Sequence, residues 1–88
     1  MLFNSGQILA TPAAVSHLLN HDKLPHDLIN KHLNGDWGDI SINDKELNET
    51  AAQIVGRILS AYTVAGEKFY VITEWDRSHT TVMLASEY

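Results

Sequence analysis

Apolar residues recur at helical spacing in the first two thirds of the chain, and they alternate with polar residues in the last third. The short apolar run 7–10 predicts a first strand. Thr11 and Pro12 then predict the start of a helix, with Thr11 as the N-cap and Pro12 at the first helical position. The polar segment 20–22 ends that helix, so the chain opens with one strand and one short helix.

A second helix is predicted to open at Pro25. Leu28, Ile29 and Leu33 form an apolar stripe that is consistent with packing against a core. Gly35 follows at the position after the helix, where a positive φ angle is usual. The two short helices are therefore expected to form a helical hairpin.

A third helix follows the loop 35–39, and either Ser41 or Asn43 can cap it. Glu46 lies three residues after Asn43, which resembles a capping box. The helix is predicted to bury one apolar face made of Leu47, Ala51, Ile54 and Val55.

The last third of the chain is rich in strand-forming residues and is interrupted by two turns. Strands are predicted over 57–64, 69–75 and 80–85, with turns at 65–68 and 76–79. Strands joined by such short turns must be antiparallel. We therefore predict a single α+β domain over 1–88 with the order β-α-α-loop-α-β-β-β. Its antiparallel sheet of three to four strands carries the helices on one face.

The composition limits the classes of function that this chain can have. Six Lys and Arg residues stand against eleven Asp and Glu, which gives a net charge of −5. That balance disfavours direct binding of nucleic acid and suits a protein partner with a basic groove, although it could serve solubility alone. The chain contains no cysteine, which excludes disulfides and thiolate metal sites. Without a leader-like or membrane-spanning segment, a cytoplasmic protein is expected. The small core leaves a homodimer open.

Four carboxylates could form an acidic cluster if the fold brings them together: Asp36, Asp39, Glu74 and Asp76. Such a cluster could hold a hard cation and support metal-dependent phosphodiester hydrolysis. The alternative is that these acids cap helices and turns. The chain has no P-loop, dinucleotide fingerprint or Gly-x-Ser-x-Gly motif, so no cofactor and no catalytic residue are assigned, and a non-enzymatic role is favoured.

Two segments have the composition of recognition loops. Trp37 lies in the glycine-flanked loop 35–39, where it either anchors a partner or plugs the edge of the core. The turn after the clearest strand combines an aromatic residue, an acid, an arginine and a histidine. The candidate protein-binding residues are Asp36, Trp37, Asp39, Glu74, Trp75, Asp76, Arg77 and His79.

Several stretches of this chain resemble a family of small bacterial proteins encoded on plasmids, prophages and integrated elements. The stretches are Gly6-Gln7, 10–13, 35–39, 57–62, 72–81 and 86–88. Members are often labelled plasmid-related protein and sometimes restriction-endonuclease subunit. This chain differs in having Trp75 where a small residue is expected, and Ala85 where proline is usual.

The resemblance implies a mobile-element context and carries over no catalytic residue. We therefore expect a small acidic binding or regulatory protein. It would contact a host or element-encoded protein, such as one that handles nucleic acid or acts in defence. The alternative is a small metal-dependent hydrolase or nuclease that uses the acidic cluster.

Overall fold

A computed structural model describes residues 1–88. Three helices and four strands follow one another along the chain, and a short 3₁₀ turn ends it. Their bounds are β1 (Gln7–Ala10), α1 (Pro12–Leu19), α2 (Pro25–Leu33), α3 (Ile42–Gln53), β2 (Ile58–Val64), β3 (Glu67–Thr73), β4 (His79–Leu84) and η1 (Ala85–Glu87). None of the helices has the length and apolar character needed to cross a membrane.

The four strands form one open sheet in the order β1-β4-β3-β2. β2, β3 and β4 are antiparallel neighbours, as their short turns require. β1 lies parallel to β4, with Gln7 opposite His79 and Ala10 opposite Val82. The predicted α+β fold and element order are confirmed, and the first strand makes the sheet mixed rather than purely antiparallel.

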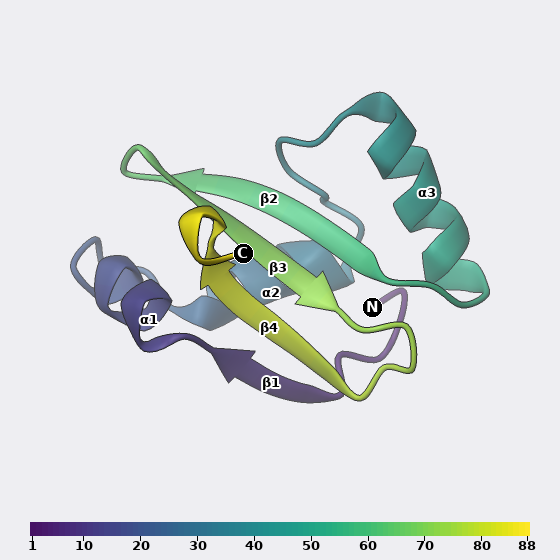
Figure 1. Ribbon diagram of the computed structural model, residues 1–88, viewed down its shortest axis with the longest axis horizontal. Helices are drawn as coiled ribbons and strands as arrows, with labels where there is room; N and C mark the ends of the chain where they lie inside the picture. The colour runs from purple at the N-terminus through teal and green to yellow at the C-terminus, as the bar shows by residue number, and fades with distance from the viewer.

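The helices cover the sheet unevenly. α1 and α2 lie behind it, whereas α3 stands beyond the β2 edge and η1 lies over the opposite face (Figure 1). Thirteen buried side chains form the hydrophobic core, most of them between the sheet and the first two helices, with Leu18, Ile29 and Phe69 among the most buried. Apart from η1, no helix covers the second face of the sheet.

The predicted apolar face of α3 is wrong. Leu47, Ile54 and Val55 are 67%, 77% and 58% exposed, and the helix ends before the last two of them. Ala51 is the one residue of the predicted face that is buried, and Asn48 is the other buried residue of α3. A helix that touches only the edge of a sheet has room for one narrow contact, so its remaining apolar residues face solvent.

The outer edge of β2 is closed by two substitutes for a fifth strand. The Ala61 N–H donates to Trp37 O and the Asp39 N–H donates to Ala61 O, as in a short parallel bridge. The Asn48 side chain pairs with both backbone groups of Leu59, at 2.7 and 3.2 Å. These contacts satisfy backbone groups that an edge strand would otherwise leave unpaired.

The bridge predicts that Gly38 cannot be replaced by a residue with a side chain without loss of stability. Its φ angle is +73°, and an added Cβ would lie 1.9 Å from Ala61 O, so the chain would have to leave β2. We expect Gly38→Ala to lower the free energy of unfolding by about 3 kcal/mol or more, measured by urea denaturation. Gly66→Ala is the matched control. Gly66 also has a positive φ, +81°, but its Cβ would meet no atom within 4 Å. It should cost only about 1 kcal/mol of backbone strain. Equal losses in the two variants would contradict the role of the bridge.

Candidate functional site

Arg77 joins the β3–β4 turn to the end of α3. Its guanidinium donates to Ala51 O and to Gly56 O, each at 2.6 Å, and more weakly to the carbonyls of Glu74 and Trp75. Ala51 O and Gly56 O belong to the last turn of α3 and to the segment that follows it. A fixed positive charge there satisfies carbonyls that have no partner within the helix.

The backbone of Arg77 fixes the start of β1 as well. Gly6 passes so close that a Cβ on it would lie 2.2 Å from Arg77 O. The guanidinium also lies 5.5 Å from the centre of the Phe3 ring. Arg77 itself has a φ angle of +59°, which costs a non-glycine residue about 1 kcal/mol or more. The hydrogen-bond partners of Arg77 are backbone carbonyls rather than the carboxylates of Asp76 or Glu74.

The Arg77 contacts bring three exposed apolar side chains to one end of the molecule. Ile54 and Val55 follow α3, and Trp75 opens the β3–β4 turn; they are 77%, 58% and 63% exposed. Trp75 was expected to extend β3, but the strand ends at Thr73. The indole therefore does not belong to the alternating side chains of β3. We call Ile54, Val55 and Trp75 the Trp75 patch.

Polar residues of the same turn flank Trp75 in the chain. Hydrogen bonds from the side chain and backbone of Ser78 hold the pKa of the Asp76 carboxyl below its usual range. The Ser78 hydroxyl lies 2.9 Å from His79 Nδ1, and His79 Nε2 lies 4.0 Å from a Glu74 carboxylate oxygen. Glu74 also lies 3.8 Å from Arg57. The turn is thus rigid and carries charges of both signs.

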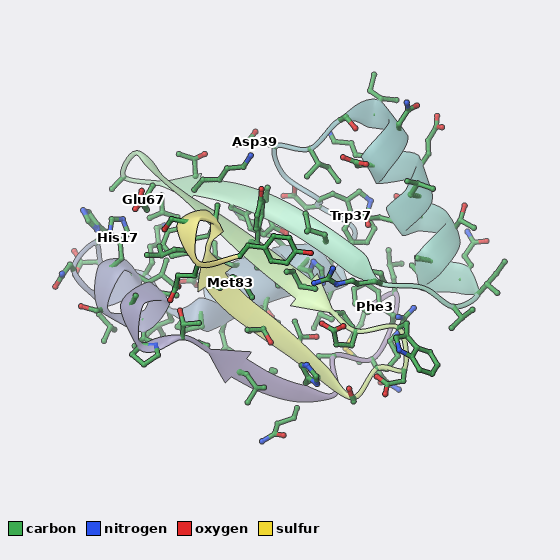
Figure 2. The ribbon with its side chains drawn as sticks, viewed as in Figure 1. Phe3, His17, Trp37, Asp39, Glu67 and Met83 are labelled. Carbon is green, nitrogen blue, oxygen red and sulfur yellow. The ribbon has the colours of Figure 1, made fainter.

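The second predicted recognition loop buries its tryptophan in the core, whereas Asp36 and Asp39 are exposed. Trp37 is 3% exposed, stacks on Phe3 and donates from Nε1 to Glu49 at 3.0 Å. The hypothesis of an exposed anchor at Trp37 does not fit this burial, and the alternative of a core plug does. Figure 2 shows Trp37 between the sheet and α3, while Asp39 lies at the outer end of the loop. Tyr62 donates to Asp36 O, and burial raises the pKa of Tyr62 to about 12.

The four acids of the metal hypothesis do not converge. Asp39 accepts from Thr63 near one end of β2, whereas Glu74 lies beside Arg57 at the other end. At about 3.3 Å per residue, these ends are roughly 20 Å apart. Asp36 accepts from the Gly38 N–H and Asp76 from the Ser78 N–H, both as turn caps. No group of three or more His, Asp or Glu side chains is placed to hold a metal ion.

A buried polar chain crosses the core, and sequence reasoning missed it. His32 of α2 lies 2.5 Å from Ser60 Oγ through Nδ1 and 2.9 Å from Thr73 Oγ1 through Nε2. Thr73 in turn lies 2.6 Å from Thr80 Oγ1, which donates to Ser5 O at 2.7 Å. All four side chains of this polar chain are fully buried. One helix is thereby tied to three strands and to the segment before β1.

The direction of every proton in this chain follows from its last acceptor. A carbonyl cannot donate, so the single Thr80 hydroxyl proton goes to Ser5 O. Thr73 must then donate to Thr80, and His32 Nε2–H must donate to Thr73. His32 Nδ1 is left as the acceptor for Ser60. The imidazole is therefore a neutral Nε2–H tautomer, and each hydroxyl proton has one defined partner.

His32 and Ser60 do not form a catalytic site, because a substrate could not reach them. The rings of Phe3 and Trp37 pack against His32. The two surface clefts, about 440 and 220 Å³, are lined by other residues. Burial lowers the pKa of His32 to about 4. The sequence did hold a signal, since His32 follows Leu28 by four residues and so shares the buried stripe of α2.

Comparison with family models, curated proteins and solved structures finds no match to this chain. The mobile-element resemblance therefore stays a prediction. The remaining indication of function is the geometry of the Trp75 patch and the chemistry of its surroundings.

Removing the Arg77 guanidinium should loosen the end that carries this patch. We expect Arg77→Ala to lower the free energy of unfolding by about 2–3 kcal/mol, because charged hydrogen bonds to partly buried carbonyls are lost. Arg77→Gly should lose about 1 kcal/mol less, because glycine tolerates the positive φ angle. Arg57→Ala removes an exposed ion pair and should cost less than about 1 kcal/mol. Urea denaturation measures all three, and equal effects of Arg77→Ala and Arg57→Ala would rule out the role of Arg77.

Protonation of His32 should oppose folding. The pKa of His32 is about 4 in the folded state and 6.5 in the unfolded state, so the unfolded chain binds the proton first as the pH falls. The stability that neutral His32 gives should be complete above pH 6.5 and should decline as the pH falls toward 4, by about 3 kcal/mol in total. Nitrogen NMR of the imidazole should show the neutral Nε2–H tautomer down to about pH 5. In His32→Gln, the loss of stability over the same range should shrink. A His32 that titrates near 6.5 would contradict the closed polar chain.

Proposed function

We propose that this chain is a small, acidic, non-enzymatic binding protein encoded by a mobile genetic element, which regulates a host or element-encoded protein by docking onto it. The docking surface is the Trp75 patch with its polar rim of Glu74, Asp76 and His79. The partner carries an apolar pocket beside basic groups, as in a protein that handles nucleic acid. The mobile-element context follows from the family resemblance alone.

The exposure of Trp75 is the observation that carries the proposal. Tryptophan is the residue most enriched among binding hot spots, and a folded protein gains little by leaving it 63% exposed. Ile54 and Val55 are further exposed apolar side chains at this end of the molecule, and the hydrogen bonds of Arg77 hold their segment beside the turn. A rigid apolar centre with a charged rim is the usual anatomy of a protein interface. Rigidity also reduces the entropy lost on binding.

The acidic balance supports the kind of partner. The chain carries a net charge of −5, and Glu74 and Asp76 lie in the turn of the Trp75 patch. A net negative charge favours rapid association with a basic surface and disfavours acidic partners. Asp76 stays ionised well into the acid range, because the hydrogen bonds of Ser78 lower its pKa.

A photo-crosslinking amino acid at position 75 tests the proposal in the native host. We expect it to capture one specific protein, whereas the same amino acid at position 24 should not. Leu24 is the matched control, since it is 55% exposed and lies before α2. The captured protein is then purified, and its affinity is measured by calorimetry. Trp75→Ala should weaken binding by about 30-fold or more, as truncation of a hot spot does. Leu24→Ala should leave the affinity unchanged.

Two results would overturn the proposal. One is capture of the same proteins from positions 75 and 24. The other is a Trp75→Ala variant that binds as tightly as the parent chain. Because Trp75 lies at the surface, its replacement should leave the fold intact, and circular dichroism checks that point.

A further inference from the structure

β1 leaves one edge of the sheet open. It lies at the border of the strand order, and no element lies beyond it in Figure 1. The Gln7 N–H donates to Ser78 O and the Thr11 N–H donates to Val82 O, both at 3.0 Å. Backbone groups point alternately to the two sides of a strand, so those of Ile8 and Ala10 face outward. Two N–H groups and two carbonyls are thus available for another strand.

Within its four residues, this edge has no lysine, proline or bulge to protect it. Natural sheets place lysines, prolines or bulges on exposed edges to prevent pairing with another chain. β1 reads Gln-Ile-Leu-Ala, and its Ile8 and Leu9 are 39% and 40% exposed. The opposite edge of the sheet is closed by the Gly38 bridge and Asn48. Pro12 follows β1 and keeps the open edge short.

Charge selects the occupant of this edge. The first 21 residues contain no Asp, Glu, Lys or Arg, and all eleven acids lie from Asp22 onward. β1, α1 and the neighbouring β4 are therefore free of formally charged side chains. Two copies of a chain with a net charge of −5 would repel each other through most surfaces, and this edge avoids that repulsion. A basic partner would gain nothing from such a neutral edge.

The outward groups also match a two-fold axis. When two β1 strands meet antiparallel with Leu9 opposite Leu9, Ile8 of each copy faces Ala10 of the other. Such pairs exchange both of their backbone hydrogen bonds, so all eight outward groups of the two copies are satisfied by four bonds. The central pair is of the closer, non-hydrogen-bonded type, and it brings the two Leu9 side chains together.

We propose that a second copy of this chain occupies the β1 edge, forming a two-fold dimer with a continuous eight-stranded sheet. Leu9 shares its face of the sheet with Thr81, Ile72 and Leu59. In this register, Gln7 of the second copy lies opposite Thr11. The Thr11 hydroxyl donates to Glu87 at 2.7 Å, so Glu87 is the one carboxylate near the interface. The Gln7 amide of the second copy can donate to it.

Sedimentation equilibrium tests the dimer with the full chain. We expect a monomer–dimer equilibrium with a dissociation constant on the order of 10 μM, since four backbone bonds and one leucine pair make a small interface. Leu9→Lys places like charges across the axis and should weaken the homodimer about tenfold or more, and Leu9→Glu should do the same. A mixture of the two variants should form a heterodimer tighter than either homodimer. Ile42→Lys is the control, because Ile42 is exposed on α3, and it should dimerise like the parent chain.

Amide hydrogen exchange tests the register directly. The Ile8 and Ala10 amides should become protected as the concentration rises, whereas those of Gln7 and Leu9 should be protected throughout. Ala10→Pro removes an outward N–H that β4 does not use, and it should weaken the dimer while leaving the monomer folded. A chain that stays monomeric to about 1 mM would overturn the proposal. So would a dimer that the Leu9 variants leave unchanged, or protection of Ile8 and Ala10 only when an added peptide binds.

Discussion

The Arg77 side chain is the contact on which the arrangement of the surface depends. Its guanidinium holds the end of α3 against the β3–β4 turn, and its carbonyl limits how Gly6 can pass. Both proposed surfaces follow from this residue, because the Trp75 patch is assembled from the two segments that it joins, and β1 begins beside it. Arg77 has a left-handed backbone conformation, which costs free energy. The hydrogen bonds of its side chain must offset that cost.

The core is stabilised by a polar chain as well as by apolar burial. His32, Ser60, Thr73 and Thr80 would be costly to bury separately, since each brings a polar group out of water. Their hydrogen bonds run in one direction and end on Ser5 O. No buried side-chain donor or acceptor is therefore left unsatisfied. Because each proton has only one arrangement, the chain also specifies how α2 sits on the strands. An apolar set of equal volume would permit more ways of packing.

Local features could be predicted from the sequence, and distant ones could not. Thr11 caps α1 through the Ala14 N–H, and Gly35 ends α2 with a φ angle of +85°, because both depend on neighbours in the chain. The parallel pairing of β1 with β4 joins opposite ends of the chain and leaves no local pattern. Leu47 and Ile54 fit a helical stripe, but how much of α3 is buried depends on the sheet edge that it meets. The role of Arg77 was hidden for the same reason, since its partners are distant carbonyls rather than nearby acids.

The two surfaces can act together, because they lie on different sides of the molecule. The Trp75 patch lies where β3 ends and β4 begins, at the ends of the strands, whereas self-association would use the long edge of β1. β1 runs parallel to β4, so a two-fold axis through Leu9 would reverse the direction of all the strands in the second copy. The two Trp75 patches would then face opposite ends of one continuous sheet. A partner with two binding sites would meet both at once, and the second contact would form at high effective concentration. Weak self-association would thereby strengthen recognition without any additional contact at the patch itself.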